Sequence, residues 1–165
     1  LKIYITLYLF SFLSTHVYGI TYYLDSMNGS DKNNGVSLKS PWATLSKIKN
    51  INLKAGDQIL LKYGSIFKGK INISNTIATK NSPIVVSTYD DNKLKDNILP
   101  KIDGAGFLGT IEIINSKWIE IRNLELTSDG GKAVDEKAKI DRYGVYVSKS
   151  QNVIIDNKVI NDDIL

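Results

Sequence analysis

The stretch SKWIEIRNLEL, residues 116–126, alternates apolar and polar side chains as a β-strand does, but the alternation shifts by one residue at Asn123. Ile119 and Ile121 fall on one face of the strand, and Leu124 returns to that face only if the chain resets its parity in between. A single residue in the left-handed conformation can do this, and Asn tolerates that conformation better than most residues with a Cβ. The stretch therefore predicts a corner at Asn123 between two strands.

The same pattern recurs further along the chain. A shift of 34 residues places TIEIINSKWIEIRNLEL, residues 110–126, on GVYVSKSQNVIIDNKVI, residues 144–160, so that Asn157 takes the place of Asn123. An earlier segment, SPIVVSTYDD, matches the second strand of this unit at an offset of 35 residues. A repeated unit of strand, turn, strand, Asn and strand is typical of a solenoid, in which each unit forms one coil. We expect the equivalent Asn side chains to stack along the solenoid axis.

Apolar residues along the chain come in alternating pairs that we expect to face the core. These pairs are Ile59 and Leu61, Ile71 and Ile73, Ile84 and Val86, Ile111 and Ile113, Ile119 and Ile121, Val145 and Val147, and Val153 and Ile155. An isolated coil has nothing above or below it, so the chain needs several stacked coils and a cap. The sequence therefore predicts an all-β solenoid.

A helix is expected before the first coil. Ser40 is a good N-cap, Pro41 suits the first helical position, and Trp42, Leu45 and Ile48 recur every three residues on one face. This apolar face must cover something apolar. We predict a short N-terminal capping helix.

The first residues resemble an export signal. An apolar run, residues 3–13, follows Lys2 and is too short to cross a bilayer, and Val17 and Gly19 are the small residues before a cut that leaves Ile20 first. A buried first strand or helix is the alternative. We predict a signal peptide over residues 1–19, no membrane span after its removal, and a secreted, periplasmic or cell-surface protein.

One domain is expected after the predicted cut. It would occupy residues 20–165, with an N-terminal cap over about 20–56 and coils from about 57, and we expect it to be incomplete at its C-terminal side because the strand pattern continues to the end. The only His is His16, in the predicted signal peptide, and there is no Cys. A Ser-His-Asp triad or a site ligated by His or Cys is then excluded within this chain.

The net charge argues against a nucleic-acid partner. The formal charge is +4, but the Lys residues are spread singly among Asn, Ile and Asp rather than gathered into a block that could follow a phosphate backbone. With 42% hydrophobic and 23% charged residues, wholesale disorder is excluded as well. A solvated, Lys-rich surface is the simplest interpretation, and an attraction to acidic polymers remains open.

Two features resemble the secreted right-handed parallel β-helix proteins of the pectate lyase superfamily. The first is the N-terminal segment YYLDSMNGSDKNNGVSLKSPWATLSKI followed by LKAGDQILLKYGSIFKGKINI, and the second is the repeat of strands with an Asn corner. Together they cover about residues 21–160. The resemblance implies a right-handed parallel β-helix. It specifies no single reaction, because the superfamily contains lyases, glycoside hydrolases and non-catalytic surface proteins.

The resemblance also implies a substrate groove along the outer face of the first strand of each coil. On this chain, the predicted substrate-binding residues of that face are Lys70, Asn72, Glu112 and Tyr146, and Ile114 and Ser148 accompany them. A 16-residue insertion, residues 127–142, would overhang the face. Long insertions in a compact repeat are usually functional or disordered.

For a lyase, the resemblance implies β-elimination of an acidic, uronate-containing polysaccharide, with a cation such as calcium offsetting the substrate carboxylate and Lys or Arg removing a proton. The candidate catalytic residues are Asp135, Glu136, Asp141 and Arg142, the candidate calcium ligands are Asp129, Asp135 and Asp141, and further candidate bases are Lys132 and Lys137. Mixed charges in a loop are also typical of a merely solvated surface.

Two other functions stay open. A glycoside hydrolase needs two carboxyl groups on either side of the scissile bond, and Glu112 with an Asp of the insertion would supply them. A non-catalytic β-helix that binds polysaccharide at the cell surface is the alternative outside catalysis. The N-terminal loop with Asp31, Asn33 and Gly35 fails the ligand spacing of a calcium loop, so we expect it to be structural.

Overall fold

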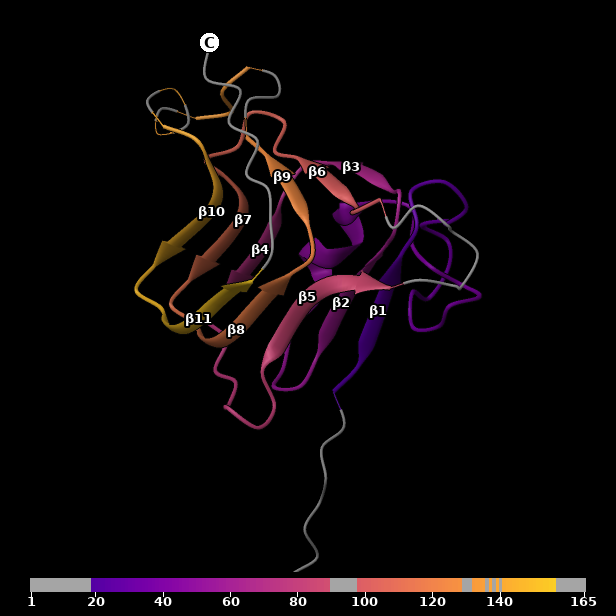
Figure 1. Ribbon diagram of the computed structural model, residues 1–165, viewed down its shortest axis with the longest axis horizontal. Coiled ribbons are helices and arrows are strands. Elements are labelled where there is room, and N and C mark those ends of the chain that lie inside the picture. The colour runs from indigo at the N-terminus through magenta and orange to yellow at the C-terminus, as the bar shows by residue number, and fades with distance from the viewer. Residues whose placement is uncertain are drawn as a thin grey trace, which may run out of the picture.

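The regular secondary structure of the described chain consists almost entirely of short β-strands in parallel sheets (Figure 1). The computed structural model describes residues 19–89, 98–128, 132–135, 137, 139 and 141–156. The strands are β1 (Thr21–Leu24), β2 (Gln58–Lys62), β3 (Ile66–Lys68), β4 (Ile71–Ser74), β5 (Ile84–Tyr89), β6 (Lys101–Asp103), β7 (Gly109–Ile114), β8 (Lys117–Arg122), β9 (Glu125–Thr127), β10 (Tyr143–Ser148) and β11 (Gln151–Asp156). One 3-10 helix, η1 (Leu45–Asn50), precedes β2.

The strands form three sheets that the chain visits in a fixed order. The large sheet has the order β1-β2-β5-β8-β11, the β7 sheet has the order β10-β7-β4, and the β6 sheet has the order β3-β6-β9. The chain runs through β4, β5 and β6 and then through β7, β8 and β9, so each circuit lays one strand beside the corresponding strand of the previous circuit (Figure 1). Every strand pair is parallel, as predicted, and the arrangement fits a β-helix.

The predicted register is confirmed residue by residue. Val145 pairs with Ile111, Val153 pairs with Ile119, and Ile84 pairs with Ile119 from the other side. These pairs reproduce the offsets of 34 and 35 residues in the sequence.

The predicted inward pairs are buried in every strand that carries one except the last two. The paired residues of β2, β4, β5, β7 and β8 are at most 3% exposed. In β10 and β11, Val145 and Val153 are only partly buried, and Val147 and Ile155 are 42% and 55% exposed. These two strands are the outermost members of their sheets, so no described strand covers them.

The corner at Asn123 has the predicted geometry. Its φ angle is 53°, in the left-handed region, and Leu124 and Leu126 on its far side are buried beside Ile121. Its predicted stacking partner, Asn157, lies outside the described residues. The parity shift in the sequence is therefore a backbone corner.

A second line of corners, which the sequence pattern did not reveal, joins the β7 sheet to the large sheet. Asn75, Asn115 and Lys149 all have positive φ angles, and Asn115 Nδ2 donates to Asn75 Oδ1 at 2.8 Å. The next residue in each coil carries a hydroxyl. The amide of Thr76 donates to Ser116 Oγ at 3.2 Å, and the amide of Ser116 donates to Ser150 Oγ at 3.0 Å. Side chains thus continue the hydrogen bonding between coils through the corner.

The predicted helix from Pro41 is wrong in type and in start. The element is a 3-10 helix that begins at Leu45, and Ser40 does not cap it but donates its hydroxyl to Asn34 Oδ1. Trp42 instead forms a parallel bridge with Leu24 and stacks on the ring of Tyr22 at 5.5 Å. Leu45 and Ile48 are buried as predicted, but a capping helix of the expected kind is not shown.

Hydrogen bonds to Asp31 hold the N-terminal loop, whose predicted structural role is consistent with these contacts. Asp31 accepts hydrogen bonds from the amides of Ala43 and Thr44 and from the Thr44 hydroxyl. Gly35 has a φ angle of 74°, and a Cβ there would lie 2.3 Å from the indole of Trp42. The hydrogen bonds to the Asp31 carboxylate hold the chain just before the 3-10 helix, where a Ser40 cap was predicted.

Lys137 and Lys139 also have helical backbone conformation. No helix in the described residues is long and apolar enough to span a membrane.

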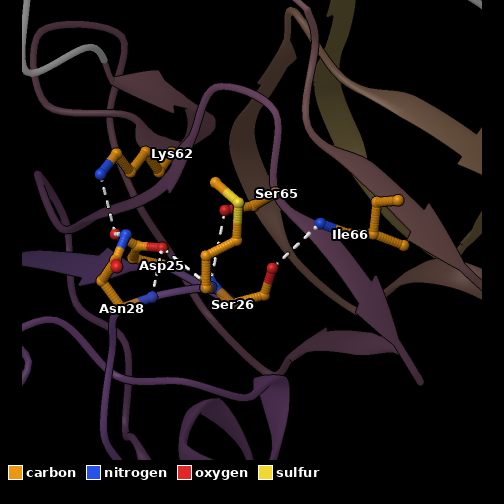
Figure 2. A network of polar contacts seen from close by, with 7 residues as sticks. Asp25, Ser26, Asn28, Lys62, Ser65 and Ile66 are labelled. Carbon is orange, nitrogen blue, oxygen red and sulfur yellow. Dashed lines mark hydrogen bonds and ion pairs between the residues drawn. The ribbon is translucent and has the colours of Figure 1, made fainter. Parts of the chain in front are cut away.

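A buried carboxylate fastens the N-terminal loop to the first coil. Asp25 is 2% exposed, and it accepts hydrogen bonds from Lys62 Nζ at 2.9 Å and from the backbone amides of Met27 and Asn28. Its contacts with Lys62 and Asn28 can be followed in Figure 2. Beside it, the amide of Ile66 donates to Ser26 Oγ. Burial raises the pKa of Asp25, but the hydrogen bonds from Lys62, Asn28 and Met27 outweigh burial and hold the pKa below its ordinary value of 3.8.

Replacing Asn123 tests the left-handed corner. Asn123→Ala should lower the free energy of unfolding by about 1 kcal/mol, because a Cβ without a local polar partner is strained at positive φ. Asn123→Gly is the matched control and should change stability by less than Asn123→Ala, since Gly adopts positive φ without strain. Urea unfolding followed by circular dichroism measures both, and an equal loss in the two variants would contradict a backbone origin.

Acid should weaken the protein through Asp25. Because the pKa of the folded state is depressed, the stabilisation is present above the unfolded value of 3.8 and is lost as the pH falls through the lower folded value. Asp25→Asn should cost about 2 kcal/mol at pH 7 and flatten the loss of stability below pH 4. Asp156→Asn, at an exposed position, is the control and should leave the acid limb of urea unfolding unchanged.

Candidate functional site

Three of the four predicted substrate-binding residues form a row on the outer face of the β7 sheet. Asn72 pairs with Glu112 in register, and Glu112 pairs with Tyr146. Their neighbours Ile71, Ile73, Ile111 and Ile113 point inward and are buried. The fourth residue, Lys70, precedes β4 and reaches Glu112 Oε2 at 2.7 Å. The structure thus brings these four residues together, and their role in substrate binding stays a prediction.

Glu112 is unusually buried for an outward-facing carboxylate. Its side chain is 9% exposed, while the Lys70 side chain is 26% exposed. Lys70 Nζ also lies 4.9 Å from the centre of the Phe107 ring, a cation–π contact. The ammonium group is thus held between an aromatic ring and a carboxylate.

Gly109 makes this arrangement sterically feasible. A Cβ on Gly109 would lie 2.8 Å from Tyr146 Cβ and 3.0 Å from Glu112 Cγ. Because the site has a Gly at this position, the side chains of Glu112 and Tyr146 can lie close to the backbone of β7. A larger residue would force them outward.

Of the hollows that include members of this row, two contain aromatic side chains. One, of about 450 Å³, is lined by Leu45, Ser46, Lys49, Lys68, Gly69, Lys70, Asn72 and Phe107. The other, of about 240 Å³, is lined by Leu108, Lys137, Asp141, Tyr143 and Tyr146. The first combines cationic groups with an aromatic ring, and the second combines two tyrosines with a carboxylate. Glu112 forms an ion pair with Lys70, which lines the first hollow, and is paired in register with Tyr146, which lines the second hollow. It therefore lies between the two hollows.

The described part of the insertion lies against the turn that carries Phe107. The amide of Val134 donates to the carbonyl oxygen of Gly106 at 3.0 Å, and a Cβ on Gly106 would lie 2.0 Å from the carbonyl oxygen of Lys132. The insertion then returns to the site at Asp141, whose amide bonds the carbonyl of Lys137.

The candidate catalytic and calcium-binding residues are only partly placed. Asp141 lines the second hollow, Asp135 is exposed, and Arg142 is partly buried. Asp129 and Glu136 lie outside the described residues. Among the residues that are described, no group of three or more His, Cys, Asp or Glu is arranged to hold a metal ion. Asp135 and Asp141 thus form no such cage with other described residues, and calcium binding stays a prediction.

Sequence reasoning missed the residues around the row. Phe107 follows a turn in which Ala105 and Gly106 have positive φ angles, and Tyr143 contacts Tyr146 at 5.8 Å between ring centres. Lys49 comes from the 3-10 helix, far from β4 in the sequence. Of these residues, only Lys68 could have been placed near the row from the sequence, because it is two residues before Lys70 and so falls on the same side of an extended chain.

A double-mutant cycle measures how strongly Lys70 and Glu112 are coupled. Lys70→Met and Glu112→Gln should show a coupling of about 1 kcal/mol in urea unfolding, because the carboxylate is shielded from water. The matched control is the pair of Arg122 and Glu120, 2.6 Å apart with the arginine 43% exposed, whose coupling should be below about 0.5 kcal/mol. Equal couplings would contradict a special environment for Glu112.

No family model matches this chain. A curated relative is the lacto-N-biosidase of Bifidobacterium longum subsp. longum, 29% identical over 194 aligned residues, which cover 87% of this chain and 12% of that protein. This chain therefore spans about an eighth of the length of that relative.

Two kinds of solved structure are similar to the chain. A GH136 lacto-N-biosidase from Eubacterium ramulus superposes with a TM-score of 0.63 at 22% identity, over 82% of this chain and 26% of that one. A rhamnogalacturonan lyase superposes with a TM-score of 0.50 at 20% identity, over 67% of this chain and 29% of that one. At these identities the likeness concerns the fold, which this chain shares with carbohydrate-active proteins of two reaction classes.

Proposed function

We propose that this chain is part of a secreted, carbohydrate-active protein of the pectate lyase superfamily that binds a saccharide across the outer face of the β7 sheet. Its strands would form a right-handed parallel β-helix, and the 3-10 helix would cover the first coil. The observation that carries the proposal is the row of Asn72, Glu112 and Tyr146, with hollows that include its two ends.

The chemistry of the row suits a sugar. Tyr143 and Tyr146 line one hollow and Phe107 lines the other, and an aromatic face packs well on the apolar C–H face of a sugar ring. Asn72 and Glu112 supply hydrogen-bonding groups for hydroxyls between these rings. Concave sites that combine apolar walls with a few fixed polar groups are typical of ligand binding.

Glycoside hydrolysis is the reaction that we place first. A glycosidase uses two carboxyl groups beside the scissile bond. Glu112 is fixed by Lys70, and Asp141 lines the hollow next to Tyr146, so the two carboxylates approach Tyr146 from different elements. The curated relative and one of the solved neighbours are named as lacto-N-biosidases, which also favours hydrolysis over elimination.

Binding or elimination of an acidic polysaccharide is the second candidate. Lys49 and Lys68 line the larger hollow, and within the described chain no carboxylate pairs with either. Two such cations would attract a uronate carboxylate. The predicted calcium of the insertion belongs to this candidate, and so does the likeness in fold to a rhamnogalacturonan lyase.

Binding and product assays on one set of saccharides test the proposal. Isothermal titration with a neutral oligosaccharide that ends in lacto-N-biose and with polygalacturonate should detect binding to at least one of them. Tyr146→Ala should weaken that binding about fivefold, because it removes an aromatic ring whose stacking on a sugar contributes about 1 kcal/mol to the binding free energy. Ile154→Ala, at a 43% exposed position on the large sheet, is the control and should bind as the parent does.

The products separate the reaction classes. New reducing ends without absorbance of unsaturated uronate would support hydrolysis, and loss of these ends in Glu112→Gln and Asp141→Asn would assign the carboxylates. Absorbance of unsaturated uronate would support elimination. Binding without any product would support the non-catalytic alternative, and the absence of binding to every saccharide would contradict the proposal.

A further inference from the structure

The first described residues lie against a buried carboxylate. The amide nitrogen of Ile20 donates to Asp57 Oδ1 at 2.7 Å, and the amide of Lys54 donates to Asp57 Oδ2 at 2.8 Å. Asp57 is 3% exposed. The amide of Gln58 in turn donates to the carbonyl oxygen of Ile20 at 2.8 Å, so Ile20 is held beside the start of β2.

Within the described residues, Asp57 has no cation as a partner. Its two recorded contacts come from neutral backbone amides, and none of the ion pairs among described side chains includes it. A carboxylate that is removed from water is costly unless a positive charge balances it. The charge of Asp57 also reaches its neighbourhood, since burial and then Asp57 raise the pKa of Tyr22 on β1.

The backbone nitrogen of Ile20, which donates to Asp57, would become the N-terminus if the predicted signal peptide were removed. The sequence predicts removal of residues 1–19, with Val17 and Gly19 as the small residues before the cut. We propose that a signal peptidase cleaves the bond between Gly19 and Ile20, and that the new ammonium group of Ile20 forms a buried ion pair with Asp57. Processing would thus supply the cation that Asp57 lacks among the described residues, a role that goes beyond the saccharide function.

The chemistry of the step is peptide hydrolysis. Water adds to the carbonyl carbon of Gly19, the bond from that carbon to the nitrogen of Ile20 breaks, and Gly19 leaves with the signal peptide as a carboxylate. The nitrogen of Ile20 takes up protons and becomes an ammonium group, with three donors in place of one. An ammonium beside a carboxylate forms a charge-assisted hydrogen bond, which is stronger than the amide contact it replaces.

Gly19 gives a test of where the chain is cut. In the uncut chain its backbone packs so closely on Gly56 that a Cβ on residue 19 would lie 1.9 Å from the carbonyl carbon of Gly56. Any side chain at residue 19 must therefore strain a protein that keeps this residue. If the cut lies after Gly19, the residue is absent from the mature protein and its side chain has no effect there.

The first experiment expresses the full chain behind an initiator Met in a secreting bacterium, as the parent and as Gly19→Ala. Since Ala is also small enough to precede the cut, intact mass and N-terminal sequencing should show Ile20 first in both secreted proteins, with identical melting temperatures. A secreted protein that begins upstream of Ile20, or a Gly19→Ala product that melts lower than the parent, would overturn the proposal.

The second experiment tests the ion pair through its pH dependence. Chains that begin at Ile20 or at Gly19, released from a fusion partner, are unfolded in urea between pH 6 and pH 9.5. An α-amino group ordinarily has a pKa of about 8, and pairing with Asp57 raises it in the folded protein. The stabilisation is therefore complete below pH 8 and is lost as the pH rises through the higher folded value.

We expect the unfolding constant of the Ile20 chain to rise up to about tenfold for each pH unit within this window, and that of the Gly19 chain to rise less. Asp57→Asn in the Ile20 chain should remove this dependence, whatever its effect at pH 6. The other titratable groups around the pair are Lys54 and Tyr22, and burial and then Asp57 raise the pKa of Tyr22 above its ordinary value of 10.0. Equal pH dependence in the Ile20 chain and its Asp57→Asn variant would overturn the ion pair.

Discussion

Parallel pairing between successive circuits of the chain is the constraint on which the rest of this structure depends. Among the described residues, each strand pairs only with strands of the circuit before and the circuit after, so a described circuit is not satisfied by itself. The same dependence holds at the corners, where backbone direction changes and strand bonds stop. There, side chains form the hydrogen bonds between circuits: the hydroxyls of Ser116 and Ser150 accept from backbone amides, and the side-chain amide of Asn115 donates to that of Asn75. Side-chain chemistry at the corners is therefore as much a part of the sheet as the strands are.

The features that sequence alone predicted are those set by short-range alternation and exact repetition. The corner at Asn123 and the inward pairs of β2 to β8 follow from a two-residue period. The pairing of Glu112 with Tyr146 follows from the repeated offset of 34 residues, and the place of Asn72 beside Glu112 was expected from the family resemblance. The second corner line escaped because its spacing changes from 40 residues between Thr76 and Ser116 to 34 between Ser116 and Ser150. A single offset could not align all three coils.

Contacts between distant segments account for what the sequence could not predict. The pattern at Trp42 looks helical, but Leu24 and Asp31 hold this part of the chain in an extended path until Leu45. The hollows around the row depend on Lys49 of the 3-10 helix, Phe107 of the turn before β7 and Tyr143 at the start of β10. Their meeting is decided by how loops pack on the strands, and local periodicity carries no information about that. The insertion, residues 127–142, is the hardest segment to predict. It carries many charged residues, and the sequence does not indicate that Asp141 is one that lines a hollow.

The hydroxyl line at the second corner has a consequence for how such a protein changes over evolutionary time. The bonds from Thr76 to Ser116 and from Ser116 to Ser150 are alike in geometry although their sequence separations differ by six residues. Circuits of unequal length are thus hydrogen-bonded to each other at the same corner, and the additional residues of a longer circuit lie in its connections. The entropic cost of a longer connection grows only with the logarithm of its length. The connections that build the site can accordingly gain or lose residues and acquire new specificity while the register of the strands beneath them is inherited intact.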